Sequence, residues 1–179
     1  MHSGPETPPG DDVDRLVSAW QRERPDLDVA PLHVLSRIAR LAKEHARIRA
    51  AAFAEHDLDA WEFDVLAALR RAGEPYELSP GRLVAETLVT SGTMTTRVDR
   101  LIARGLAERR PDPRDRRGVL VRLTPSGRDV VDGALGTLLD HEHAVVSALS
   151  EEDRSALPDI LRRLLVVAAT HTTTAHTTT

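Results

Sequence analysis

The stretch SGTMTTRVDRLIARGLAERRPDPRDRRGVLVRLT, residues 91–124, decides the expected fold of this chain. Its first part carries apolar residues at helical spacing, which predicts a helix over 93–104. Gly105 follows and closes the helix in the left-handed conformation that glycine adopts cheaply. The apolar stripe of this helix consists of Met94, Val98, Leu101 and Ile102. The opposite, polar face is therefore left for contacts outside the core.

After Gly105 the apolar pattern changes from helical to alternating. Val119, Val121 and Leu123 alternate with their neighbours, which is typical of a half-buried strand. Residues 106–110 are the expected partner strand, and 111–118 are the expected hairpin tip. Asp115 lies between arginines in that tip, where we expect its carboxylate to orient one of them.

A second short helix is expected just before residue 90. Ser79 can cap it, and Pro80 suits its first position. We expect its inward residues to be Leu83, Val84 and Leu88. Thr90, Ser91 and Gly92 then make a tight turn, so the two helices form a helix-turn-helix to which the hairpin adds a wing.

Longer helical patterns flank this module. On the N-terminal side we expect helices from Val13 to Pro25, with Asp11 or Asp12 as cap, then over 32–54 and 59–71. On the C-terminal side, Thr124 caps a helix that reaches about residue 149, and Ser150 caps a last helix over 151–168. The expected inward residues of the helix at 32–54 are Leu32, Leu35, Ile38, Ala39, Ala42, Ala46 and Phe53; those of the helix after Thr124 are Val130, Val131, Leu135, Leu138, Leu139 and Val145.

The fold class predicted from these elements is mainly α with a small β-wing: a winged helix-turn-helix with N- and C-terminal dimerisation helices, since the flanking helices are too long and too apolar for one chain of this size to cover alone. Five regions are expected: a disordered N-terminus over 1–10, N-terminal helices over 11–56, the winged helix-turn-helix over 57–124, C-terminal dimerisation helices over 125–168, and a disordered tail over 169–179.

Composition narrows the class of protein. The 179 residues include no cysteine, which excludes disulfides and thiol chemistry. They also include no run of about eighteen apolar residues, and the first residues lack the pattern of a secretion signal. We therefore expect no membrane association and a cytoplasmic, nucleoid-associated protein.

The charge is unevenly distributed. Residues 91–128 hold ten arginines and four acidic residues, a net charge of +6. Because the whole chain carries −4, the remainder carries −10. A compact basic segment within an acidic body indicates that a polyanion binds one face.

The residue types of this segment suit double-stranded DNA. Small hydroxyl side chains at the start of the helix allow close entry into a major groove, and arginine can bind guanine with two hydrogen bonds. The arginines of the hairpin can reach a minor groove. The predicted DNA-binding residues are Ser91, Thr93, Thr95, Thr96, Arg97, Arg100, Arg114, Arg116 and Arg117. Arg104 also lies on or near the polar face of the helix.

The run DPRDRRGVLVRLTPSG, following TTRVDRLIARGLAERR, resembles the MarR family of bacterial regulators. The likeness covers about residues 30–168 and implies a homodimer with interleaved terminal helices. It implies two winged modules that read the half-sites of a palindromic operator, about one helical turn apart.

A ligand site is expected near this module. Asp64 lies in the otherwise apolar run WEFDVLAAL, and a buried carboxylate needs a cationic partner, which Arg97 or Arg109 can supply. A planar organic anion could enter between Trp20 and Arg97, stacking on the indole and pairing with the guanidinium. Trp20 also fits the apolar stripe of its own helix and could simply belong to the core.

Within the MarR family the chain resembles the urate-responsive branch, also called UrtR or PecS-like. The matching positions are Trp20, Asp64, Arg97 and Arg109, with intervals of 33 and 12 in residue number separating the last three. The resemblance implies that Trp20 and Arg97 hold the ligand, that Asp64 senses its charge and that Arg109 transmits the change to the wing.

Three functions stay open. The first is a repressor released by urate; the second is the same regulator responding to a tricarboxylate such as trans-aconitate or citrate; the third is an architectural or protein-binding winged helix without a ligand. No cofactor is expected, and His141 and His143 do not share a helix face as metal ligands would. No nucleophile elbow or glycine-rich phosphate loop is present, so an enzyme is not expected.

Overall fold

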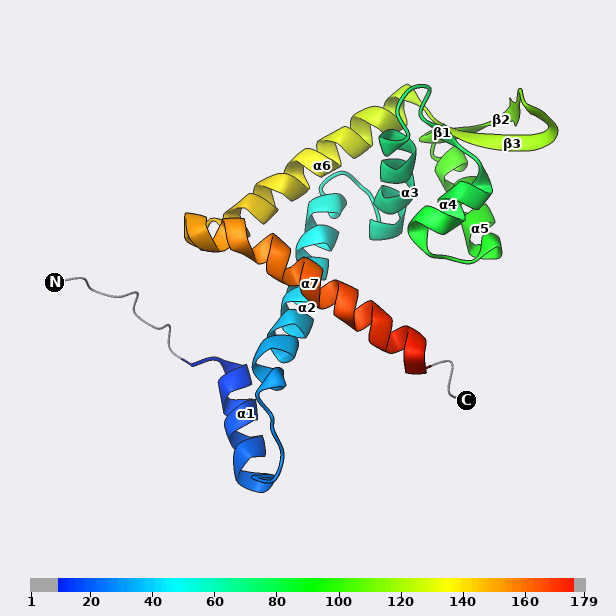
Figure 1. Ribbon diagram of the computed structural model, residues 1–179. Coiled ribbons are helices and arrows are strands. Elements are labelled where there is room, and N and C mark those ends of the chain that lie inside the picture. The colour runs from blue at the N-terminus through cyan, green and yellow to red at the C-terminus, as the bar shows by residue number, and fades with distance from the viewer. Residues whose placement is uncertain (1–9, 176–179) are drawn as a thin grey trace. The chain divides into compact units, whose positions relative to one another are not determined.

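The computed structural model describes residues 10–175, and for Arg116 and residues 172–175 it describes the backbone alone. The segments 1–9 and 176–179, which belong to the termini expected to be disordered, lie outside the described residues. The chain divides into two compact units, the first ending at Ala60 and the second beginning at Trp61. Figure 1 shows the order of the elements along the chain.

The first unit consists of α1 (Asp12–Glu23) and α2 (Pro31–Ala54). Asp11 caps α1, and its side chain accepts hydrogen bonds from the backbone N–H groups of Val13 and Asp14. Arg37 of α2 donates to the carboxylates of Asp11 at 2.9 Å and Asp14 at 2.7 Å, which clamps the start of α1 onto α2. The hydrogen bond from Arg37, together with that from the backbone N–H of Asp11, holds the pKa of Asp14 below its usual value.

The inward face predicted for α2 is largely wrong for a single chain. Leu35 is 56% exposed, and the alanines at 39, 42 and 46 are exposed as well. Phe53 is fully buried, as predicted, whereas Leu32 and Ile38 are half-buried. The helix forms where its apolar pattern predicts it, but α1 packs against only part of the apolar surface of α2.

The second unit begins with α3 (Ala60–Arg71), α4 (Pro80–Thr87) and α5 (Ser91–Ala103). The Ser79 and Thr90 hydroxyls accept hydrogen bonds from backbone N–H groups of α4 and α5, so both helices start at a side-chain cap. Because Thr90 is the cap, Ser91 and Gly92 are the first helical residues rather than the predicted turn. Leu88 was expected to face inward, but it ends α4 in the left-handed region and is 91% exposed.

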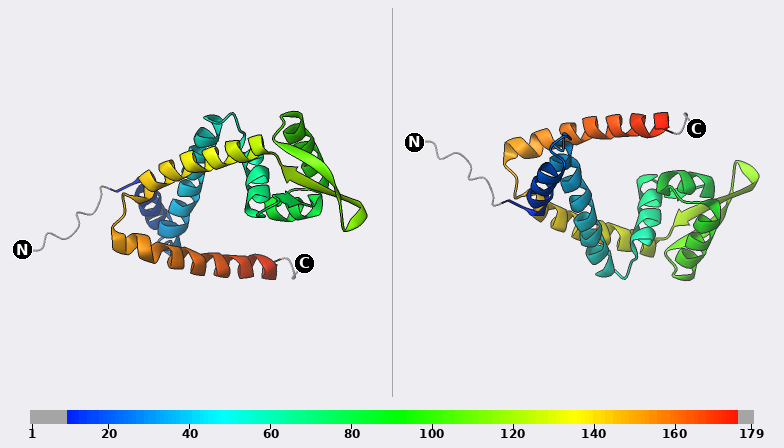
Figure 2. Two further views of the ribbon diagram at one scale, coloured as in Figure 1. Left: turned by 90° about the horizontal axis from the view of Figure 1, so that it is seen from above. Right: turned by 90° about the horizontal axis from the view of Figure 1, so that it is seen from below.

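A three-stranded antiparallel sheet forms the wing, in the order β1-β3-β2. Its strands are β1 (Glu77–Leu78), β2 (Ala107–Asp112) and β3 (Asp115–Leu123). The two-residue strand β1 was not predicted, because two residues cannot display an alternating pattern. In Figure 1 the β2–β3 hairpin lies beside α4 and α5, and Figure 2 shows it extending beyond these helices.

The hairpin tip is shorter than the predicted 111–118. Asp112 pairs with Asp115, which leaves Pro113 and Arg114 between the strands. The Asp112 side chain accepts from the backbone N–H of Arg114 at 2.8 Å, and that of Asp115 accepts from the backbone N–H of Arg117 at 2.9 Å. Asp115 therefore stabilises the backbone of the wing through this hydrogen bond. The sequence suggested a different contact, in which the carboxylate orients an arginine side chain.

Two helices complete the unit, α6 (Pro125–Val146) and α7 (Glu151–Ala175). Thr124 and Ser150 cap them as predicted. Helix α7 extends past the predicted end at 168, because no proline or glycine interrupts the threonine-rich sequence that follows. The core of the unit combines residues from α3, α4, α5, the sheet and α6; its members include Phe63, Leu66, Leu69, Leu83, Met94, Val98, Leu101, Val121, Leu123, Val131 and Leu138.

Many apolar side chains of the last two helices remain exposed. Of the inward residues predicted for α6, Val131 and Leu138 are buried, whereas Leu135, Leu139 and Val145 are 41–45% exposed. Most large apolar residues of α7 are also exposed, Leu161 being half-buried; the exposed ones are Leu157, Ile160, Leu164, Leu165, Val166 and Val167. Within residues 10–175, none of the helices combines the length and apolar character needed to cross a bilayer.

Candidate nucleic-acid interface and ligand site

The first two turns of α5 present small polar side chains to solvent. Ser91, Thr93, Thr95 and Thr96 are all exposed, while Met94 between them is buried. The Thr95 hydroxyl donates to the Ser91 carbonyl at 3.1 Å, and the Thr96 hydroxyl donates to the Gly92 carbonyl at 3.3 Å. Their hydroxyl lone pairs therefore remain available to donors on a base edge, and their methyl groups suit thymine.

Two arginines of α5 lie over one aromatic ring. The guanidinium carbons of Arg97 and Arg100 are 5.4 Å and 5.1 Å from the centre of the Trp61 ring. Trp61 is the second residue of α3, and both contacts are within cation–π range. The sequence suggested Trp20 as the aromatic partner of Arg97 instead. Trp20 belongs to the first unit and is 49% exposed, so it does not lie in the core, which was the alternative expected for it.

The buried carboxylate of α3 is that of Glu62 rather than that of Asp64. Glu62 is 4% exposed, and its Oε2 lies 2.7 Å from an Nη of Arg104 at the end of α5. Asp64 is only half-buried, because the helical spacing turns Glu62 and not Asp64 toward α5. Arg104, which was expected on or near the DNA-facing side, thus serves to join α5 to α3.

Arg109 forms an ion pair with Asp99, not the pair with Asp64 that the sequence suggested. The Arg109 Nη lies 2.7 Å from the Asp99 Oδ1, and both side chains are about half exposed. Asp99 is on α5 and Arg109 is on β2, so this pair links the helix to the wing. Such an exposed ion pair adds little stability, and an external anion could compete for the guanidinium.

The wing presents further arginines. Arg114 at the tip and Arg117 at the start of β3 are exposed, whereas the side chain of Arg116 lies outside the described part of the structure. A hollow of about 410 Å³ lies between the tip and the N-terminus of α4, and Ser79, Arg82 and Arg114 are among the residues that line it. Sequence reasoning missed Arg82, although its position in the first turn of a capped helix suits a phosphate.

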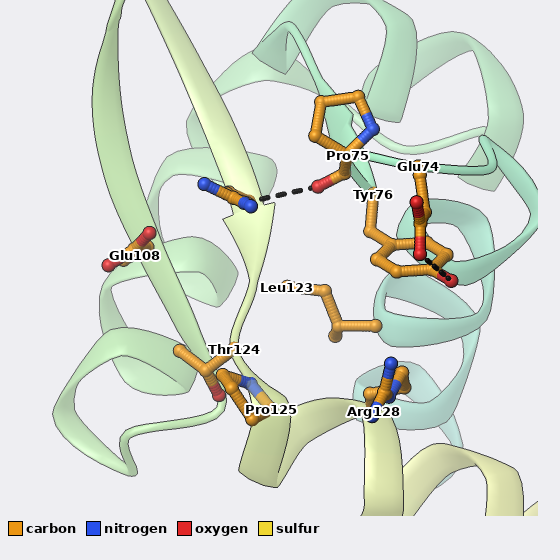
Figure 3. Close-up of a pocket in the computed structure, with 9 residues that line it drawn as sticks. Glu74, Pro75, Tyr76, Glu108, Leu123, Thr124, Pro125 and Arg128 are labelled. Atoms are coloured by element: carbon orange, nitrogen blue, oxygen red, sulfur yellow. Dashed lines mark hydrogen bonds between the residues drawn. The ribbon is translucent and has the colours of Figure 1, made fainter.

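A second hollow, of about 480 Å³, lies between the wing and the start of α6 (Figure 3). Glu74, Tyr76, Glu108 and Arg128 contribute its polar wall, together with Arg122. Arg122 donates through Nε to the Pro75 carbonyl at 3.1 Å, the dashed line that ends at Pro75 in Figure 3. None of the four predicted ligand residues lines this hollow. The hydrogen bond from Arg122 of β3 to Pro75 holds the loop before β1 against β3.

Comparison with known proteins agrees with this architecture. Residues 56–118 match the model of the MarR family. The transcriptional regulator PecS of Dickeya dadantii (strain 3937) is 36% identical over 153 residues, which cover 86% of this chain and 92% of PecS. Its name is that of a regulator rather than of an enzyme.

Solved structures of the same type share the fold. A mutant of MarR from E. coli, crystallised with operator DNA, is 27% identical with a TM-score of 0.64, over 78% of this chain and 99% of that one. BpsR of Bordetella bronchiseptica, whose DNA binding is regulated by 6-hydroxynicotinic acid, is 31% identical with a TM-score of 0.61, over 73% and 91%. The chain therefore belongs to the MarR family of transcriptional regulators.

Proposed function

We propose that this protein is a homodimeric repressor that binds a palindromic operator and is released by a small organic anion, with urate as the first candidate. The observation that carries the DNA-binding part is the start of α5, where exposed hydroxyls stand one turn before Arg97 and Arg100. The exposed Arg114 of the wing gives a second contact to the same duplex. We place the protein in the cytoplasm, on the nucleoid.

The apolar surface supports a second copy of the chain as the partner. Leu135 and Leu139 lie one turn apart on α6, and Ile160 and Leu164 are spaced in the same way on α7; all four are at least 37% exposed. Monomeric proteins rarely expose such contiguous apolar stripes. A dimer through these helices would bury them and set the distance between the two copies of α5.

The proposed ligand residues remain Trp20, Asp64, Arg97 and Arg109. Arg97 already packs on an aromatic face, and Arg109 has a surface ion pair that an anion can replace. The ligand would release DNA only through a difference in its affinity for the free and the DNA-bound conformations. BpsR, regulated by a small aromatic acid, supports the ligand class but not the choice of urate.

Footprinting on the intergenic region upstream of the gene tests DNA binding, and adding urate, citrate or trans-aconitate tests release. Release by urate at the lowest concentration supports the first candidate, whereas release by a tricarboxylate supports the second. A protein that binds with little sequence preference and is released by none of them is the architectural winged helix.

Trp20 allows a sharper test of the ligand site. In a Trp61→Phe background, Trp20 fluorescence should change on titration with urate. Adding Trp20→Phe should abolish release from DNA by urate and leave DNA affinity unchanged. A double variant that is still released at the wild-type urate concentration would remove Trp20 from the site.

A further inference from the structure

Trp61 contacts two side chains that the DNA-binding model needs. Arg97 and Arg100 are three residues apart on α5, so their side chains project from the same face. Both guanidinium groups lie within 5.5 Å of the centre of one indole ring. The ring, partly exposed at the start of α3, thus restricts the rotamers of both arginines at once.

Glu62, the next residue, extends this arrangement along α5. It binds Arg104, which is four residues beyond Arg100 on the same helix face. The first turn of α3 therefore contacts three arginines in and just after α5: Arg97 and Arg100 through the Trp61 ring, and Arg104 through an ion pair with the buried Glu62 carboxylate. The ion pair fixes the C-terminal end of the helix, while Arg97 is half-buried and Arg100 is exposed.

A cation–π contact uses none of the guanidinium N–H groups in a conventional hydrogen bond. An arginine held over an aromatic ring therefore keeps donors for a phosphate or the edge of guanine. Among the described residues, no acidic side chain forms an ion pair with Arg97 or Arg100. Both arginines thus lie on the proposed DNA-reading helix itself, held over the ring and not neutralised by an ion pair.

We infer that Trp61 is a positioning residue for DNA binding: its ring orders Arg97 and Arg100 before the duplex arrives. A long arginine side chain loses considerable rotamer freedom when it binds, and prior stacking reduces that loss. Trp61 acts through the two arginines and does not itself contact DNA. The inference rests on the proposed function, because it assigns Trp61 a role in operator binding.

The test compares Trp61→Ala, Trp61→Phe and wild type on the upstream operator at fixed salt. Two exposed cation–π contacts correspond to a loss of about 5- to 30-fold in affinity for Trp61→Ala. Trp61→Phe retains an aromatic face and should stay within about 3-fold of wild type. Tyr76→Ala is the matched control, because it removes a ring that stacks on Arg70, at 5.0 Å, away from α5.

A coupling measurement separates positioning from general damage. In an Arg97→Ala/Arg100→Ala background, Trp61→Ala should cause no further loss of affinity, because the ring has nothing left to order. An equal loss in both backgrounds, or wild-type affinity for Trp61→Ala, would overturn the inference.

A measurement without DNA keeps this outcome distinct from failure of the proposed function. In the free protein, the Nε–H proton resonances of Arg97 and Arg100 should be shifted upfield by the indole ring current, and Trp61→Ala should abolish that shift. Absence of the shift refutes the positioning contact. Failure of the wild-type protein to bind any upstream DNA refutes the proposed function instead.

Discussion

Replacing Gly127 by alanine should destabilise the protein, although alanine is the better helix former. Gly127 lies in the first turn of α6, and a Cβ there would collide with the backbone carbonyl of Leu106 and approach Leu123 Cδ1 to 3.0 Å. The Leu106 carbonyl cannot simply move away, since it accepts a hydrogen bond from the Thr124 N–H at 3.2 Å and precedes β2. The glycine is thus what lets the start of α6 pack on the base of the wing.

The magnitude follows from two opposing effects. Overpacking against a fixed neighbour costs about 1–3 kcal/mol or more, and the severity of this overlap favours the upper end. The helix propensity of alanine returns at most about 1 kcal/mol, and less in a first turn. The expected net loss is about 2 kcal/mol, which lowers the thermal midpoint by about 4–8 °C in a chain of this size.

Gly136→Ala on the same helix is the matched control. A Cβ at Gly136 meets no heavy atom within 4 Å, so alanine there should stabilise the helix by about 0.5–1 kcal/mol. Both variants are compared with wild type by circular dichroism melting at one protein concentration, since association alters the midpoint. A Gly127→Ala midpoint at or above that of wild type would refute the packing of α6 on the wing.

Three further predictions follow from individual contacts. Arg104→Met leaves the buried Glu62 without its guanidinium partner and should lower the free energy of unfolding in urea by about 3 kcal/mol, whereas Glu62→Leu/Arg104→Met should recover most of that loss. Equal stability of the two variants would contradict a stabilising role for this ion pair. Arg114→Ala should weaken operator binding similarly for all sequences and reduce the salt slope by about one unit, and an unchanged slope would remove this side chain from the phosphate contacts. The pKa of Asp14 is lower in the folded protein than its usual value, so its contribution to stability is present above the usual carboxyl pKa and is lost as the pH falls below it. Arg37→Met should therefore weaken the acid dependence of the thermal midpoint. An identical pH profile for the variant and the wild type would argue against the clamp.

The sequence predicted the DNA-facing module well because its signals are local. Ser79 as a cap, Gly105 as a stop signal and the alternating Val119 to Leu123 each depend on neighbouring residues, and α4, α5 and β3 formed where these signals stand. The hairpin tip was misjudged, since side-chain bonds from Asp112 and Asp115 tightened a turn that composition alone made look longer.

The candidate site was predicted less well because its contacts join distant segments. Asp64 was chosen as the buried carboxylate since it interrupts an apolar run, but helical phase decides burial, and that phase buries Glu62. Trp61 was overlooked as a partner of Arg97, because a pairing across 36 residues leaves no periodic trace. The apolar face of α2 was expected to be buried, and much of it is exposed. An apolar pattern predicts that a face will be covered, but it does not tell whether the covering surface belongs to the same chain.

The central claim is that two copies of α5 and its wing bind duplex DNA together. A hydroxyl-radical footprint of the purified protein on its own upstream region, at low salt and with the stoichiometry measured by sedimentation, tests this claim most directly. The account predicts two chains per site and two protected half-sites about 10 base pairs apart, centre to centre. A monomeric protein that leaves this DNA unprotected would contradict it.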